Sequence, residues 1–422
     1  MLGPVGSSLG AGSCGFAIDA GDFDSAKEAG DELLEQVLDA DPAGCTGFRI
    51  DLAGTFHLDD TLLWDFPEPL TLSGPAAGAG DPARLVAVTS GAPESDVTHR
   101  ILTAEPAPPG DTVGKVTIER LILTGGAVQS VDGDDDLGGA VLADVVELVD
   151  SELVGNSAVS GGAVAAREVR AERTSFVDNG AVTGAGQGGA IRATEQVTLV
   201  NVTFSGNVAG EGGAVWLPAT GTLDATSVTF SGNEVSTTFA GTDLHLGLTG
   251  SGSVTLRGVL FAGVDDESDG PSCGGVALSA TGMTLEVDGS FEAVDDPADL
   301  SCDGVTPTIG PLALTTVPFL AGTTALPVPD GGPASIGQVA CGAGWPAVDQ
   351  RGVARPQGDT CDAGAVEREV MVVPPPPPPP LPPVPEPQPE PEPEAVVEGP
   401  VPTSVPAGDG TCADGCPAFG RR

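Results

Sequence analysis

The sequence has no tyrosine, and aromatic residues make up only 4% of its 422 residues. A helical or sandwich domain of this length normally fills its core with aromatic side chains, because each ring buries a large apolar area. Small residues take their place, including 62 glycines. The composition therefore favours a thin interior of stacked aliphatic side chains over a thick, aromatic-rich core.

Basic residues are also scarce. The chain has 16 Lys and Arg against 60 Asp and Glu, so its formal net charge is -44. Such a charge repels phosphate backbones and anionic lipid headgroups, which argues against nucleic acid and membrane surfaces as partners. A halophilic or extracellular setting, or weak uptake of divalent cations, suits this charge better.

Long apolar runs are missing as well. No stretch reaches the roughly 18 consecutive apolar residues of a membrane-spanning helix, so we expect no transmembrane span. Residues 1–13 contain no apolar run of signal-peptide length, and the first basic residue is Lys27. A secretory signal is therefore not visible, which leaves open a start upstream of Met1.

The eight cysteines are not arranged in the CxxC pairs of a zinc site. An even number without such pairs predicts disulfides and an oxidising compartment, with free thiols in a cytosolic protein as the alternative. Sequence order suggests neighbouring pairs, although it does not fix the connectivity. The candidates are Cys14, Cys45, Cys273, Cys302, Cys341 and Cys361, and Cys412 and Cys416 follow near the end of the chain.

One sequence unit occurs six times between Val116 and Phe261. Each copy has two apolar residues separated by one position, then a larger apolar residue, and the copies start 30, 23, 28, 26 and 31 residues apart. In four copies an Asn lies three residues after the large apolar residue, and Gly-Gly-Ala-Val or Gly-Gly-Ala-Ile recurs from Gly138 onward. The repeated residues include Phe176, Asn179, Phe204, Asn207, Phe230 and Asn233.

Repeats of this length indicate stacked units, each unable to bury its apolar face alone. Val, Thr and Phe broken by Gly, Asn and Ser are typical of strands and turns, and each period has room for about three strands of roughly 5 residues. We therefore predict an all-β, right-handed parallel β-helix. Like residues of successive coils would form ladders about 4.8 Å apart, with Phe inside, Asn at a turn and Gly-Gly at a bend that needs positive φ.

Residues 24–39 predict one helix. Ser25 and Glu28 form a capping box, and an apolar stripe follows, made of Ala26, Ala29, Leu33, Leu34, Val37 and Leu38. A parallel β-helix has an open apolar end, so we expect this helix to cover the first coil, with Cys14 and Cys45 on either side of it. An unrelated surface helix is the alternative.

The repeated words resemble the repeats of polymorphic outer membrane proteins, a family of bacterial surface β-helices, and the opening FRIDLAGTFHL resembles the first coil of pectin-lyase-like proteins. Residues 349–367, DQRGVARPQGDTCDAGAVE, resemble the closing segment of the bacterial choice-of-anchor Q domain. These resemblances imply a surface-displayed β-helix over residues 46–367. We expect residues 349–367 to form a C-terminal lid, in which Arg351 and Arg355 pair with carboxylates or carbonyls and Cys341 is tethered to Cys361.

Three regions follow from this interpretation: an N-terminal segment with the capping helix at 1–45, the β-helix at 46–367, and a tail at 368–422. The tail contains seven prolines from Pro374 and ends with the Cys-containing segment. Residues 374–402 would form a polyproline II stalk of at most about 90 Å, disordered with respect to the packed domain.

The search for a catalytic site finds none. Lyase chemistry on uronates needs a strong base beside acidic residues that hold calcium, but the only lysines are Lys27 and Lys115. Arg173 and Arg192 could share a face, and their glutamate neighbours favour ordinary ion pairs. The three histidines have no companion nucleophile motif and are assigned structural or exposed roles: His57, His99 and His245.

Calcium is the one cofactor considered. Asp132, Asp134 and Asp136 alternate in VDGDDDLGG as the ligands of a calcium loop do. Leu137 takes the place of the expected glycine and no closing Glu follows, so a solvated acidic turn is the preferred interpretation.

The sequence thus predicts a non-catalytic, secreted or cell-surface β-helix for adhesion or glycan binding. The expected partner is a polysaccharide or another surface component. A polysaccharide lyase or hydrolase of the pectin-lyase-like fold, and a self-associating structural surface component, remain the alternatives.

Overall fold

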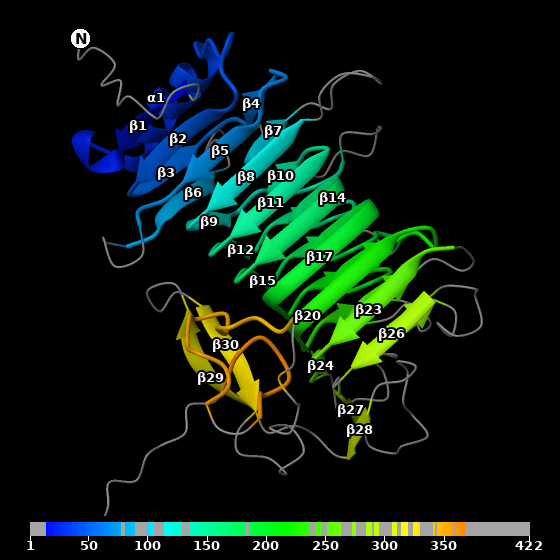
Figure 1. Cartoon of the computed structure of the whole chain (residues 1–422). Helices are drawn as coiled ribbons and strands as arrows, with labels where there is room; N and C mark the ends of the chain where they lie inside the picture. The colour runs from blue at the N-terminus through cyan, green and yellow to red at the C-terminus, as the bar shows by residue number, and fades with distance from the viewer. Residues whose placement is uncertain are drawn as a thin grey trace, which may run out of the picture. The chain divides into compact units, whose positions relative to one another are not determined.

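Figure 1 shows a computed structural model of the chain. The chain divides into two compact units, residues 1–371 and 372–422, and every described residue belongs to the first unit. The described residues are 14–76, 81–88, 99–104, 114–128, 136–181, 185–236, 242–246, 251–262, 272–275, 341, 344–357 and 360–367, with five further strands between Thr284 and Pro329.

The first unit is a parallel β-helix, as the repeats predict. Each coil supplies one strand to each of three parallel stacks, here named sheet 1, sheet 2 and sheet 3. Three long strands turn corners and serve more than one sheet: β14 (Val164–Glu172), β17 (Ile191–Ser205) and β20 (Thr222–Ser231). A minor fourth stack lies between sheets 2 and 3 along the chain: β13 (Ser157–Ala158), β16 (Gly180–Ala181), β18 (Val208–Ala209) and β21 (Glu234–Val235).

The remaining strands of sheet 1 are β1 (Cys14–Asp19), β2 (Phe48–Ala53), β5 (Leu70–Ser73), β8 (Lys115–Glu119), β11 (Val145–Val149), β23 (Ser253–Arg257) and β26 (Thr284–Asp288). Those of sheet 2 are β3 (Thr55–Leu58), β6 (Ala83–Ala87), β9 (Leu121–Thr124), β12 (Glu152–Val154), β15 (Ser175–Val177), β24 (Leu260–Phe261), β27 (Phe291–Val294) and β28 (Thr306–Ile309). Those of sheet 3 are β4 (Leu62–Trp64), β7 (Leu102–Ala104), β10 (Val141–Leu142), β19 (Val215–Leu217), β22 (Leu244–Leu246) and β25 (Cys273–Gly275). Beyond them, β29 (Leu314–Phe319) and β30 (Thr324–Pro329) form an antiparallel pair.

The repeated large apolar residue forms a stack of rings inside the coils. Phe176, Phe204, Phe230 and Phe261 lie nearly parallel, with successive ring centroids 4.9, 5.1 and 5.1 Å apart. All four are at most 1% exposed. The spacing matches the distance between neighbouring strands, so the strand register itself places each ring on the next.

The repeated asparagine forms a second ladder. The side-chain oxygens of Asn179, Asn207 and Asn233 each accept the backbone N–H and the side-chain N–H of the asparagine one coil earlier, at 2.8 to 3.1 Å. Each side-chain nitrogen also donates to a main-chain carbonyl. These amides are fully buried, and the ladder satisfies their polar groups.

The two glycines of each Gly-Gly pair are needed for different reasons. The first has a φ of 63 to 70° at Gly138, Gly161, Gly188 and Gly212. A Cβ on the second, such as Gly189, would lie 2.0 Å from the carbonyl oxygen of Gly213 in the next coil. The first glycine makes the bend, and the second lets neighbouring coils touch backbone to backbone.

Helix α1 (Ala26–Leu38) packs on β3 and β4 at the first coil, after the short 3₁₀ helix Ala20–Asp22 (Figure 1). Ser25 accepts the backbone N–H of Glu28 at 3.2 Å, which confirms the predicted start of the helix. Of the expected apolar stripe, Ala29, Leu33 and Val37 are buried, but Leu38 is 70% exposed. The helix therefore covers the first coil with a narrower face than the sequence predicts.

The segment 344–367, here named the strap, lies against the side of the coils rather than over their end. Gln350 accepts a hydrogen bond from the hydroxyl of Thr203 at 2.6 Å and donates to the carbonyl of Thr174 at 2.9 Å. Farther along, the backbone N–H of Ala365 bonds the hydroxyl of Thr229 at 2.9 Å. The prediction that this segment covers the C-terminal end of the coils was therefore wrong. The strap lies along their side because the outward hydroxyls of sheet 2 form hydrogen bonds with it.

The strap is held together by its own polar groups. A disulfide joins Cys341 to Cys361. The buried guanidinium of Arg355 contacts the carboxylate of Glu367 at 3.1 Å and donates to the carbonyls of Asp362 and Gly364. Burial raises the pKa of Glu367, while backbone N–H donors and Arg355 oppose that shift. Arg355 thus binds carbonyls and a carboxylate inside the strap, which are the kinds of partner that the sequence predicted for it.

Candidate functional site

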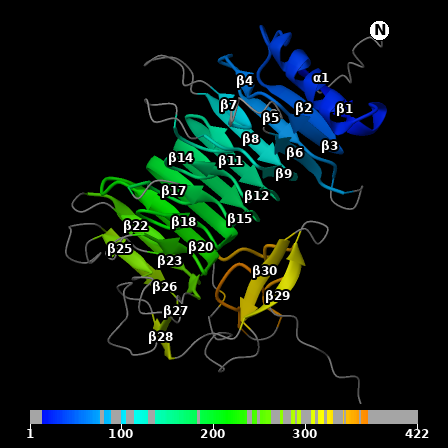
Figure 2. The ribbon, with the colours of Figure 1, turned by 180° about the vertical axis from the view of Figure 1, so that it is seen from behind.

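The outward side chains of sheet 3 form one ladder, because the strand register places one residue of each coil beside the next. Figure 2 shows strands of this sheet, among them β4, β7, β14, β17 and β22, following one another along the coils. At about 4.8 Å per step, the ladder extends over about 29 Å. Its members are Leu63, Thr103, Leu142, Ala165, Arg192, Trp216 and His245.

The last three members of this ladder, Arg192, Trp216 and His245, have polar or aromatic side chains. The guanidinium carbon of Arg192 lies 5.4 Å from the ring centroid of Trp216, which is a cation–π contact. Both side chains are half-buried, so each keeps a surface toward solvent. The strand register holds the two planar groups together at the spacing of neighbouring strands.

A carboxylate and an amide complete the cluster from the loops that precede the Gly-Gly bends. Trp216 donates its indole N–H to Glu211 Oε2 at 3.2 Å, and Gln187 donates its side-chain N–H to the same oxygen at 3.2 Å. Arg192 Nε donates to Gln187 Oε1 at 3.3 Å. The four side chains therefore form a closed ring of contacts, here named the Arg-Trp cluster.

His245 borders the cluster on the next coil. It is 7% exposed, and its Nε2 lies 3.9 Å from Glu211 Oε2. Burial lowers the pKa of His245, and the opposing effect of Glu211 is the smaller one, so the imidazole is neutral at neutral pH. Within the described part of the chain, its Nδ1 has no hydrogen-bond partner.

Arg192 differs electrostatically from the arginines of the neighbouring coils. Arg167 contacts three carboxylates, and Arg173 contacts Asp150 and Glu172. Arg192 has no carboxylate within ion-pair distance among the described residues, and burial lowers its pKa without a compensating charge. The guanidinium still remains protonated, so its terminal N–H groups present an uncompensated positive charge on an acidic protein.

The structure separates Arg173 and Arg192, which the sequence allowed to share a face. Arg173 lies at the corner between sheets 1 and 2 with a φ of 47°, and its ion pairs confirm the preferred interpretation. Arg192 lies on sheet 3, and the prediction of an ordinary ion pair was wrong for it. The reason is the register, which places Trp216 beside Arg192, whereas Glu168 and Glu195 pair with Arg167 and Glu172 pairs with Arg173.

The calcium candidates are divided by the described ranges. Asp132 and Asp134 lie outside the described residues. Asp136 is 7% exposed, and its carbonyl accepts the backbone N–H groups of Val159 and Ser160. In the part of the chain that the structure covers, no three acidic, histidine or cysteine side chains converge on a metal position.

The other titratable candidates lie apart from the cluster. Lys115 contacts Glu147 at 2.9 Å, and Lys27 contacts Asp31 and Asp59 at 2.9 and 2.6 Å. The Lys27 ammonium lowers the pKa of Asp59 through their hydrogen bond. His57 lies on β3, and His99 Nε2 is 3.1 Å from the carbonyl oxygen of Leu58.

Disulfides join Cys14 to Cys45 and Cys341 to Cys361, and the first pair brackets α1 as sequence order suggested. Cys273 is also disulfide-bonded. Cys302, Cys412 and Cys416 lie outside the described residues.

Sequence reasoning missed Trp216, Glu211 and Gln187. A signal for them was present, because the residue that directly follows each Gly-Gly-Ala-Val/Ile word occupies the outward rung of sheet 3. Aligned on that word, the rung contains Leu142, Ala165, Arg192 and Trp216 in order. This alignment would have predicted that Arg192 and Trp216 lie beside each other on neighbouring coils.

Residues 201–218 match the Chlamydia polymorphic membrane protein repeat. The matched segment includes Phe204, Asn207 and Trp216, so it covers one large apolar residue, one ladder asparagine and one rung of the cluster. Neither a curated protein nor a solved structure matches the chain. Among the described residues, no helix has the length and apolar character needed to cross a membrane.

Proposed function

We propose that the chain is a non-catalytic, surface-associated β-helix that binds a glycan along sheet 3. The resemblance to polymorphic membrane protein repeats supports a surface location, and the disulfides are compatible with an extracellular one. The closing segment supports a surface protein of the choice-of-anchor Q type through its sequence alone.

The observation that carries the proposal is the Arg-Trp cluster. Sugars present hydroxyl groups that both donate and accept hydrogen bonds, together with apolar C–H surfaces. The cluster offers donors on Arg192, acceptors on Glu211 and an aromatic ring on Trp216, all fixed by mutual contacts. A few positioned polar groups beside aromatic surface are typical of ligand sites.

The geometry of the ladder favours an extended ligand. The outward residues of sheet 3 lie in register over about 29 Å, and the half-buried and exposed rungs among them suit several successive sugar units better than one. Arg192, on the fifth of the seven rungs, has no ion-pair partner among the described residues, and this favours glycans that contain uronic acid, because carboxylates bind arginine through two parallel hydrogen bonds.

The test uses the full chain with a panel of uronate and neutral polysaccharides, with and without calcium, and follows both chain cleavage and bound sugar. We expect binding without cleavage. Arg192→Gln and Trp216→Ala should each weaken binding by about tenfold, which corresponds to the loss of one charged hydrogen bond or one aromatic contact.

Arg170→Gln is the matched control, because Arg170 is exposed on sheet 1 of a neighbouring coil. Equal losses in the Arg170 and Arg192 variants would indicate diffuse attraction and reject the cluster as the site. Cleavage of any polysaccharide would reject the non-catalytic assignment, and absence of binding to the whole panel would reject glycan recognition.

A further inference from the structure

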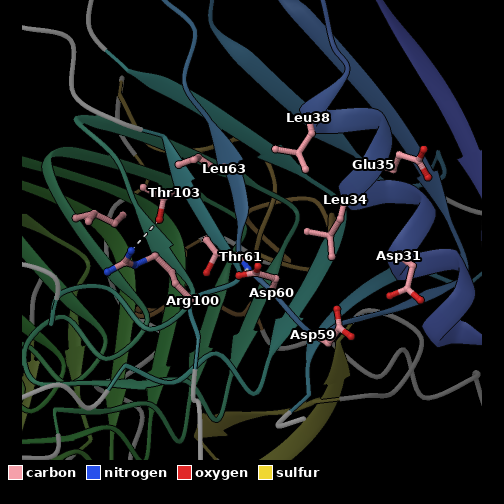
Figure 3. A pocket seen from close by; sticks show the side chains of 11 residues that line it. Asp31, Leu34, Glu35, Leu38, Asp59, Asp60, Thr61, Leu63, Arg100 and Thr103 are labelled. Carbon is pink, nitrogen blue, oxygen red and sulfur yellow. Dashed lines mark hydrogen bonds between the residues drawn. The ribbon is translucent and has the colours of Figure 1, made fainter. Parts of the chain in front are cut away.

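A groove of about 760 Å³ lies at the first coils, between α1, the turn that joins β3 to β4, and the beginning of the sheet 3 ladder (Figure 3). It is separate from the Arg-Trp cluster, which lies on later coils of the same ladder. The lining residues are Asp31, Leu34, Glu35, Leu38, Asp59, Asp60, Thr61, Leu63, Arg100, Thr103 and Leu142.

The groove has apolar walls that the fold leaves open. Leu38 on α1 is 70% exposed and Leu63 on β4 is 41% exposed. Figure 3 shows Leu34 and Leu38 on the helix side and Leu63 on the strand side. Among the described residues, only Val208 is also a large, exposed hydrophobic residue, so exposed apolar surface is concentrated here.

The rim of the groove is negative. Asp31 and Glu35 come from α1, and Asp59 and Asp60 come from the β3–β4 turn. The last turn of α1 contains no basic residue, so the partial negative charge of the helix C-terminus adds to that of the carboxylates. The walls and the rim together favour a ligand that is both apolar and cationic.

The one basic residue in the lining does not neutralise this rim. Arg100 is buried and donates to the carbonyls of Leu137 and Gly138 and to the hydroxyl of Thr103, at 2.7 to 2.8 Å. Its guanidinium is therefore held by Thr103 and by the carbonyls of Leu137 and Gly138. Lys27 contacts Asp31 and Asp59 but is itself highly exposed, so a second cation can share those carboxylates.

Two other occupants fit less well. A metal ion requires converging ligands, and the described residues of the groove contain no such group of three. A second copy of this chain would bring an acidic surface to an acidic rim, because the chain has 60 acidic and only 16 basic residues.

We propose that this groove docks a basic segment of a partner protein that also carries aliphatic side chains. Lysine or arginine residues of the segment contact the rim, and an aliphatic side chain lies between Leu38 and Leu63. The groove shares Leu63, Thr103 and Leu142 with the beginning of the sheet 3 ladder, but it uses none of the residues of the Arg-Trp cluster, so variants of the cluster and of the groove test the two proposals separately.

The experiment titrates the full chain into a fluorescein-labelled peptide built from lysine and leucine, and follows fluorescence anisotropy. Companion peptides replace leucine by serine or lysine by glutamate. We expect the lysine–leucine peptide to bind, with affinity that falls as salt is raised, and both companions to bind at least about tenfold more weakly.

Variants then locate the contact. The double variants Leu38→Ser/Leu63→Ser and Glu35→Gln/Asp60→Asn should each weaken peptide binding by about tenfold. The matched controls are Val208→Ser, which removes the other exposed hydrophobic side chain, and Glu234→Gln, which removes an exposed carboxylate elsewhere. All of these positions, Leu63 included, are surface positions outside the sheets' inner faces, and circular dichroism verifies that each variant folds.

Three results would overturn the proposal. The first is no binding of the lysine–leucine peptide. The second is equal weakening by the controls, which would indicate diffuse attraction to an acidic protein. The third is a dimer in sedimentation velocity that Leu38→Ser/Leu63→Ser dissociates, because the groove would then be occupied by a second copy.

Discussion

Each asparagine of the ladder contributes strongly to the stability of the fold. Asn207 Oδ1 accepts two hydrogen bonds from Asn179, and Asn207 Nδ2 donates to the carbonyl of Phe176 and to Asn233 Oδ1. Truncation would leave buried donors and acceptors without partners, each at a cost of about 1 to 3 kcal/mol. The ladder therefore makes every coil dependent on the coils beside it.

We predict that Asn207→Ala lowers the free energy of unfolding by about 3 kcal/mol, measured by urea denaturation followed by circular dichroism. Thr198→Ala is the control, because Thr198 is half-exposed on the same coil, and it should cost less than about 1 kcal/mol. Similar values for the two variants would mean that water replaces the lost bonds.

Residues of the repeat were more predictable than residues of the corners. Phe204 and Asn207 have the same environment in each coil, so their recurrence is visible in the sequence. Arg173 and Ser227 adopt φ values of 47 and 55° at one corner, yet nothing in their chemistry distinguishes them from residues in ordinary turns. The stacking of neighbouring coils imposes that backbone conformation, so the residue types at these positions do not predict it.

At the scale of an element, the strap depends on one close contact at a corner of the coils. Gly258 has a φ of 57°, and a Cβ there would lie 2.2 Å from the ring of Trp345. Gly232 has a φ of 59°, but a Cβ there would meet no atom within 4 Å. The two glycines share the same backbone requirement and differ in the contact with the strap.

We predict that Gly258→Ala displaces Trp345 toward solvent, whereas Gly232→Ala does not. The measurement is a red shift of tryptophan emission in a chain whose other two tryptophans, Trp64 and Trp216, are changed to phenylalanine. Equal shifts in both variants would show that backbone strain, rather than the ring contact, controls the position of the strap.

The strap and the capping helix show why some elements were predictable and others were not. Ser25 and the apolar residues after it define a helix locally, so its position was foreseen. The strap is held by the carbonyl of Thr174, at a corner, and by the hydroxyls of Thr203 and Thr229, which look like ordinary outward residues of strands. All three are distant in sequence from Gln350 and Ala365. The candidate site was hidden for a similar reason, because its rungs change identity from coil to coil.

At the scale of the whole molecule, the net charge of -44 opposes compaction. We predict that raising KCl from about 0.01 M to about 1 M increases Tm by roughly 5 °C, because the Debye length falls from about 30 Å to about 3 Å and repulsion is screened. Thermal melts in choline chloride are the control, and screening should produce the same increase there. A rise confined to low concentrations of calcium would point instead to a specific cation site.

The strap also limits how this chain can change its number of repeats. Its hydrogen bonds reach Thr174, Thr203 and Thr229, and then the carbonyl of Gly258, so it connects four successive coils at fixed separations. A coil duplicated among these four would move the attachment points apart by about 4.8 Å and detach part of the strap. A coil duplicated before Thr174 would leave them unchanged. Gene duplication can therefore extend this protein before Thr174, while the strap fixes the number of coils between Thr174 and Gly258.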